Sequence, residues 1–281
     1  MRKVFETASP VRLRVEIPKG RVRVIAAPAA VQTVVELVAM KGDPVAQAWI
    51  DEAEVAQRGD EVVVLVRKHG LAFFGLGGAI EATIFAPAGS AAAIGTGSGR
   101  IETEGPLGDV RAGTGSGHIH IAAGADVHVR SGSGDIVVDA ATGTADVKTG
   151  SGRIVIGQAG RDVRVATGSG HAEVASAVGE VRVTTGSGNI EVGDAGDRLE
   201  AFAASGHVRV RRADHGKVRA RTVSGHVSVG VASGTTAWLD LTTLSGKVRS
   251  DLESAGEPGP GEKSVELRLE TVSGNIEVQR A

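Results

Sequence analysis

The chain has 281 residues, no cysteine and a formal net charge of −2 at pH 7. The lack of cysteine excludes disulfides and thiolate metal sites, and the balanced charge lacks the polycationic signature of a nucleic-acid-binding protein. A secretory signal would need an apolar segment after Met1-Arg2-Lys3, and none is visible. No run approaches the ~20 apolar residues that a membrane helix needs. We therefore expect a cytoplasmic protein by default, with surface attachment through a partner left open.

Residues 1–93 differ from the rest and are predicted to form an N-terminal β-rich cap. Asp43 before Pro44 is typical of a helix start, with the acid as N-cap and proline at the first helical position, so one short helix is expected over 44–52. Alternating apolar residues or turn signals place the cap strands at 11–17, 22–24, 32–40, 54–57, 61–68 and 80–87.

From residue 94 the chain repeats itself. Ser-Gly followed by a polar and then an apolar residue recurs with a period of 18 and slips of one, which indicates a repeat architecture. The serines are Ser98, Ser116, Ser133, Ser151, Ser169, Ser187, Ser205 and Ser224, with weaker copies at Ser245 and Ser273.

Each repeat contains two apolar alternations that are out of phase. In one copy Val163 and Val165 have odd numbers, whereas Ala172 and Val174, after the Ser169-Gly170 bend, have even ones. One straight strand would put half of these residues into water, so the chain must turn at the glycine bend. Eight threonines two residues before the serines share the inward parity and are expected to hydrogen-bond along this corner.

Two short strands and two corners per repeat predict an all-β fold over residues 94–281. We expect a β-solenoid, or parallel β-helix, with two short strands in each rung of about 18 residues and with the N-terminal cap at one end. An antiparallel sandwich or barrel is the alternative. The solenoid is preferred because Ser-Gly corners alternate with a second kind of corner, which a meander has no reason to maintain.

The same residues carry a resemblance. The segment from Leu13 to Val24, the iterated Ser-Gly-x-[IV]-x-[VI] units and the [DE]-Val-x-Val units resemble the bacterial DUF4097-type β-strand-repeat family, whose members are often labelled "putative adhesin". The resemblance implies a β-helical fold, and it implies no catalytic residues and no cofactor.

Towards the end of the chain a Pro/Gly-rich segment, 253–263, is predicted to be a mobile loop. Leu267, Leu269, Ile276 and Val278 are predicted to form the last rung. Such a rung would leave an open edge, so end-to-end self-association is expected to be available to the chain.

Basic residues dominate the predicted outward positions before the serines. A rigid comb of cations with ~4.8 Å spacing could bind a polyanion such as an acidic polysaccharide or a lipid surface. The plainer interpretation is that basic residues suit the solvent face of strands. This basic stripe, which Asp146 and Glu200 interrupt, consists of Arg111, His128, Arg130, Lys148, Arg164, Arg182, Arg219 and Arg221.

His207 and His226 fall on adjacent rungs and could share a metal ion, but no third ligand accompanies them, so no metal site is predicted. An enzyme would need convergent carboxylates in a cleft, and the sequence indicates none. The favoured interpretation is a non-enzymatic structural or interaction scaffold for an unidentified protein partner. The alternative is a polyanion- or glycan-binding module that uses the basic stripe.

Overall fold

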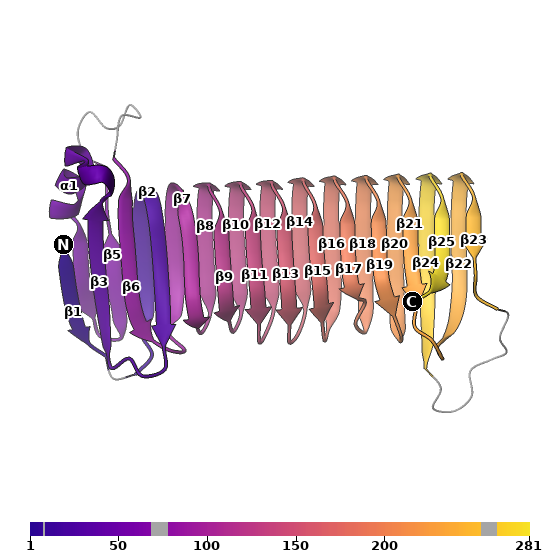
Figure 1. Ribbon diagram of the computed structural model, residues 1–281, viewed down its shortest axis with the longest axis horizontal. Helices are drawn as coiled ribbons and strands as arrows, with labels where there is room; N and C mark the ends of the chain where they lie inside the picture. The colour runs from indigo at the N-terminus through magenta and orange to yellow at the C-terminus, as the bar shows by residue number, and fades with distance from the viewer. Residues whose placement is uncertain (8, 69–77, 254–262) are drawn as a thin grey trace. The chain divides into compact units, whose positions relative to one another are not determined.

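The computed structural model describes residues 1–7, 9–68, 78–253 and 263–281, so most of the predicted mobile loop lies outside the described residues. The fold is almost entirely β, with the parallel solenoid pairing that the sequence predicts, and it divides into two compact units, residues 1–142 and 143–281. Figure 1 shows the strands coloured along the chain. No helix in the described ranges is long and apolar enough to span a membrane.

The first unit contains eleven strands, a 3₁₀ turn and one α-helix in its described part. Its elements are β1 (Arg2–Glu6), β2 (Arg12–Ala27), β3 (Gln32–Ala39), the 3₁₀ turn (Met40–Gly42), α1 (Pro44–Asp51), β4 (Glu54–Arg58), β5 (Glu61–Leu65), β6 (Ile80–Pro87), β7 (Ala91–Pro106), β8 (Val110–Ser116), β9 (Ile119–Gly124), β10 (Val127–Ser133) and β11 (Ile136–Ala141).

The N-terminal end of this unit contains the predicted helix. Asp43 caps α1, since its carboxylate accepts hydrogen bonds from the backbone N–H groups of Val45 (2.8 Å) and Ala46 (3.2 Å). The helix buries Trp49 and Ile50. Around it, β3 pairs antiparallel with β1 and β6, and β4 pairs antiparallel with β5.

Parallel stacking in the first unit begins at β2. This long strand bends at Gly20 and pairs in parallel with β7 on both sides of the bend, so that Gly20 aligns with Gly99. β7 then pairs with β8 and β9, β8 with β10, and β9 with β11. Rung geometry therefore starts inside the segment 1–93 rather than after it, because the stretch from Leu13 to Val24 already has the two-strand pattern of one repeat.

The second unit contains fourteen strands in its described part. They are β12 (Ala145–Ser151), β13 (Ile154–Ala159), β14 (Val163–Ser169), β15 (Ala172–Ala177), β16 (Glu180–Ser187), β17 (Ile190–Asp194), β18 (Arg198–Ser205), β19 (Val208–Ala213), β20 (Gly216–Ser224), β21 (Val227–Val231), β22 (Thr236–Ser245), β23 (Val248–Ser250), β24 (Ser264–Ser273) and β25 (Ile276–Arg280).

These strands form two parallel stacks, one on each face of the coil. The first stack runs β12–β14–β16–β18–β20–β24–β22, and the second runs β13–β15–β17–β19–β21–β25–β23. The predicted change of phase is confirmed, because Val163, Val165, Ala172 and Val174 are all buried. A thin core of valine, isoleucine and alanine therefore lies between the stacks.

The corner after each first-stack strand depends on glycine. Gly188 has φ +148°, and its N–H donates to the Ser205 carbonyl at 2.8 Å. The predicted threonine column lies just inside this corner and is largely buried; Thr222, for example, donates to the Gly206 carbonyl at 2.9 Å. The Ser-Gly bends of neighbouring rungs thus lie in register, as the prediction required.

The order of the final three rungs differs from the sequence order. β24 pairs with β20 on one side and with β22 on the other, while β25 lies between β21 and β23. The prediction that residues 264–280 form the terminal rung is therefore wrong, although these residues do form a rung. They lie between two earlier rungs, and β22 and β23 form the end of the stack.

Candidate functional site

The outer face of the first stack in the second unit aligns side chains from seven strands. Parallel pairing in register places each outward residue beside its equivalent one rung away. We call one such alignment the charged row, and its members, in stack order, are Asp146, Arg164, Arg182, Glu200, Arg219, Arg268 and Asp240. A second row two residues further along each strand consists of Lys148, Ala166, Thr184, Phe202, Arg221, Glu270 and Thr242.

The structure divides the predicted basic stripe between the two units and between rows. In the first unit Arg111 and His128 are neighbours on β8 and β10, whereas Arg130 aligns with Gly113. In the second unit Arg164 and Arg182 are neighbours in the charged row. Arg219 belongs to the same row, and Lys148 and Arg221 belong to the second. The stripe is therefore not one uninterrupted column of cations.

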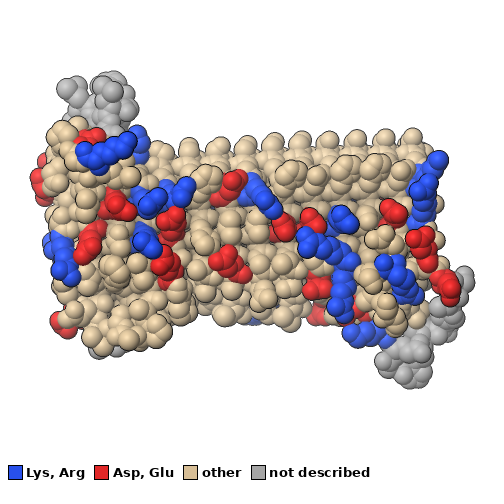
Figure 2. All heavy atoms as spheres, viewed as in Figure 1, with Lys and Arg blue, Asp and Glu red and all other residues tan. Residues whose placement is uncertain are grey.

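Carboxylates accompany most stripe members of the second unit. Arg182 contacts Glu200 at 2.8 Å and Glu180 at 3.2 Å. Three further stripe cations each have a carboxylate at 3.6 Å: Lys148 from Asp146, Arg164 from Asp162 and Arg221 from Glu270. In the face shown in Figure 2, basic and acidic side chains are interspersed rather than separated by sign. These exposed pairs contribute little stability, about 0–1 kcal/mol each, but they offset much of the positive potential.

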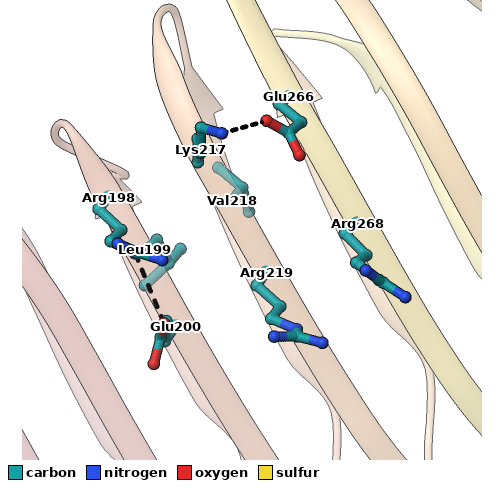
Figure 3. A pocket seen from close by; sticks show the side chains of 8 residues that line it. All are labelled: Arg198, Leu199, Glu200, Lys217, Val218, Arg219, Glu266 and Arg268. Atoms are coloured by element: carbon teal, nitrogen blue, oxygen red, sulfur yellow. Dashed lines mark ion pairs between the residues drawn. The ribbon is translucent and has the colours of Figure 1, made fainter.

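Arg219 differs from its neighbours. Within the described part of the chain it has no carboxylate in ion-pairing distance, although Glu200 precedes it in the row. Arg219 lines a hollow of about 150 Å³. In the same lining Lys217 pairs with Glu266 at 2.7 Å and Arg198 with Glu200 at 3.5 Å, and Figure 3 shows how these residues lie. The side chains of Arg219 and Arg268 extend together away from those two pairs.

A second, larger hollow of about 310 Å³ adjoins the first, and Arg219 and Glu200 line both. Its distinctive member is Phe202, which is 38% exposed and aligns with Arg221 on one side and Thr184 on the other. Phe202 is not among the residues of the predicted basic stripe. Successive side chains of a strand point to opposite faces, and Leu199, Ala201 and Ala203 are buried. The even position of Phe202 therefore indicates that its ring faces outward.

The histidine column at the Ser-Gly corner has a structural role. The Nδ1 atom of His171, His207 and His226 accepts a backbone N–H from the next rung in the stack, and Asn189 and Asn275 accept equivalent bonds through Oδ1. The rings of His207 and His226 stack with centroids 4.9 Å apart. Across the described ranges no group of three or more metal-ligating side chains comes together.

One titratable cluster lies at the opposite corner. Asp214 accepts hydrogen bonds from Lys263 (2.8 Å) and His215 (2.5 Å), and these bonds lower the pKa of Asp214 from 3.8 to about 2. The hydrogen bond to Asp214 is also the main reason why the pKa of His215 is raised above 6.5, with a further contribution from Asp197 at 3.1 Å. This cluster joins the end of β19 to the residue before β24 and is a corner clamp.

Comparison with solved structures finds several of low similarity. A putative adhesin from Parabacteroides merdae shares 9% identity, with 99% of this chain and 95% of that chain covered and a TM-score of 0.46. A putative adhesin from Bacteroides fragilis also shares 9% identity, with 99% and 96% covered and a TM-score of 0.40. A putative cell adhesion protein from Clostridium sporogenes shares 11% identity, with 100% and 99% covered and a TM-score of 0.26.

None of the curated proteins compared with the chain matches it. The model of the family described as Toastrack DUF4097 matches residues 57–279, which is most of the chain. The match includes the Ser-Gly corners from Ser98 onwards and every strand from β5 to β24. The chain therefore belongs to the Toastrack DUF4097 family.

Proposed function

We propose that the protein is a non-enzymatic interaction scaffold that binds a protein partner through the outer face of its second unit. The observation that carries this proposal is the surface around Arg219 and Phe202. There an exposed aromatic ring lies among charged side chains whose positions are fixed by in-register strands. Aromatic residues and arginines are the side chains that most often dominate the binding energy of protein interfaces.

The arrangement of charge favours a protein partner over a uniformly charged polymer. Along the charged row, Arg182, Glu200 and Arg219 alternate in sign on neighbouring strands. A partner surface with complementary alternation would gain specificity and a fixed register from such a row. A polyanion would meet the carboxylate of Glu200 between two of the guanidinium groups.

The test uses a photo-crosslinking residue at two exposed apolar positions of the second unit. We expect Phe202→p-benzoylphenylalanine to capture a defined protein from cells that produce the 281-residue chain. The matched control carries the same residue at Val178, which is 69% exposed at a corner away from the hollow. Adding Arg219→Glu should abolish capture at 202. Equal capture at both positions, or capture that is insensitive to Arg219→Glu, would refute the proposal.

A polyanion- or glycan-binding module is the second candidate, and one observation favours it. Arg182, Arg219 and Arg221 surround the 310 Å³ hollow, and Arg219 has no carboxylate partner among the described residues. If this function holds, the chain should bind heparin or anionic vesicles with an affinity that falls as salt rises. Charge reversal at both Arg164 and Arg182 should then abolish binding. Binding that survives the double reversal excludes the stripe.

A further inference from the structure

The end of the second unit exposes two strand edges. β22 pairs with β24 and β23 with β25, and neither has another strand beside it in the described part of the chain. Unpaired backbone N–H and C=O groups along a strand edge are a template for pairing with another chain. Figure 1 shows β22 and β23 beyond β24 and β25 at this end of the stack.

Side chains along β22 show that this edge lacks the cover that every other rung has. Leu239 and Leu241 point towards the core but are only half-buried, whereas their partners in β24, Leu267 and Leu269, are fully buried. On the outer side Trp238 is 59% exposed, at a position where the next rung inward has Glu266. Leu244 is 83% exposed.

Of the two edge strands, β22 is the one that lacks proline and unpaired charge. Natural sheets protect an exposed edge with unpaired charges, proline or a bulge. β22 contains no proline, and its single charged residue, Asp240, lies 3.3 Å from Arg268 of the adjacent rung. Among the described residues, this ten-residue strand with two exposed large apolar side chains therefore ends the first stack without a proline or an unpaired charge of its own.

We propose that this edge binds the same edge of a second copy of the chain about a two-fold axis. A two-fold axis perpendicular to both stacks would pair β22 with its copy and β23 with its copy, both antiparallel. Such an isologous contact satisfies both edges at once and closes, so it gives a dimer and not a filament. Antiparallel pairs are compatible with an otherwise parallel sheet.

The residues on the edge are self-complementary in one register. When Leu241 lies on the axis, Trp238 faces Leu244 of the partner subunit and Asp240 faces the partner's Thr242, so no like charges are opposed. Leu241 and Ser250 are each the fifth residue from the Ser245–Gly246 peptide bond, so the same axis passes through both stacks.

The second stack is complementary in that same register. With Ser250 on the axis, Arg249 faces Asp251 of the partner subunit, and the two-fold axis repeats this opposite-charge pair. One axis therefore serves both strands and places Arg249 opposite Asp251 of the partner subunit. This charge complementarity favours a second copy of the chain as the occupant of the edge.

Sedimentation equilibrium on the 281-residue chain tests the proposal. We expect twice the monomer mass at micromolar concentration, and a monomer for the double variant Trp238→Lys, Leu244→Lys, with at least a tenfold weaker association. Because both side chains are exposed, these changes should leave the far-ultraviolet circular dichroism spectrum unaltered. The control is Val178→Lys, which removes an exposed apolar side chain elsewhere in the unit and should remain dimeric.

Cysteine crosslinking tests the register independently, since the chain has no cysteine of its own. Leu241→Cys should form a disulfide with its own copy under mild oxidation, because cross-strand partners have Cβ atoms about 5 Å apart and no reagent has to fit between the stacks. Thr243→Cys should not, since it faces Leu239 of the partner subunit. A wild-type monomer at all concentrations, a dimer that survives the two lysines, an open series of oligomers, or crosslinking at 243 but not at 241 would each overturn the proposal.

Discussion

Replacing Gly188 with alanine should open the coil at one corner. The φ of Gly188 is +148°, a conformation that side chains with a Cβ rarely adopt. A Cβ at this position would lie 1.9 Å from the carbonyl oxygen of Gly170 in the neighbouring rung, where ordinary contact begins at 3.4 Å. The obstacle is backbone, so no side chain can rotate away, and the two rungs must separate.

The cost follows from the contacts that this separation breaks. The backbone conformation alone costs about 1–3 kcal/mol for a residue with a Cβ. Moving these two rungs apart also weakens the corner hydrogen bonds that join them, from the Gly170 N–H to the Ser187 carbonyl at 2.8 Å and from the Ala172 N–H to the Asn189 carbonyl at 3.0 Å, at about 1 kcal/mol each. We therefore expect Gly188→Ala to lower the free energy of unfolding by about 3–5 kcal/mol.

Urea unfolding followed by circular dichroism measures this loss, with hydrogen exchange at the Gly170 and Ala172 amides, which bond across the two separating rungs, as a local readout. The matched control is Gly234→Ala in the same unit. Gly234 has φ +75°, but a Cβ added there would have no atom within 4 Å, so only the conformational cost should appear. If the two variants lose the same stability within about 0.5 kcal/mol, close approach of the rungs is not what requires glycine at the corner.

Two further predictions concern polar groups at the corners. His207→Asn should leave stability nearly unchanged in urea unfolding, because an amide oxygen can replace Nδ1 as acceptor for the His226 N–H. His207→Ala should cost about 1 kcal/mol, and equal losses for the two variants would contradict the acceptor role. The lowered pKa of Asp214 stabilises the fold above about pH 4, and this contribution is lost as pH falls towards 2. The raised pKa of His215 stabilises it below pH 6.5, and this contribution is lost as pH rises through that raised value. Asp214→Asn should therefore lower stability most between about pH 4 and 6.5, by about 2 kcal/mol, and a difference that does not vary with pH would exclude the clamp.

The sequence predicted the coil because its signal is local and repeated. The phase change between Val165 and Ala172 requires a corner, and eighteen-residue spacing then determines which residues align. The helix start at Asp43 was predictable for the same reason, since a cap and its helix are adjacent in the chain.

The candidate site was only partly predictable. The alternation along each strand identified the outward cations. How far a carboxylate offsets the positive charge of each cation depends on side chains one rung away, such as Glu200 beside Arg182. The exposed ring of Phe202 follows the same parity rule, yet its neighbours come from strands on both sides. The order of the last rungs was not predictable. β22 and β24 have the same alternation of inward and outward residues, and β24 pairs in register with both β20 and β22.

The insertion of β24 and β25 between earlier rungs also affects the order in which the chain can fold. During synthesis residues 236–250 leave the ribosome before residues 264–280, although the latter supply the strands on which the former rest. Stepwise winding from the N-terminus can therefore proceed only as far as β21. The two remaining rungs can be completed only after residues 264–280 have been made, and these later residues then lie between strands that were made earlier.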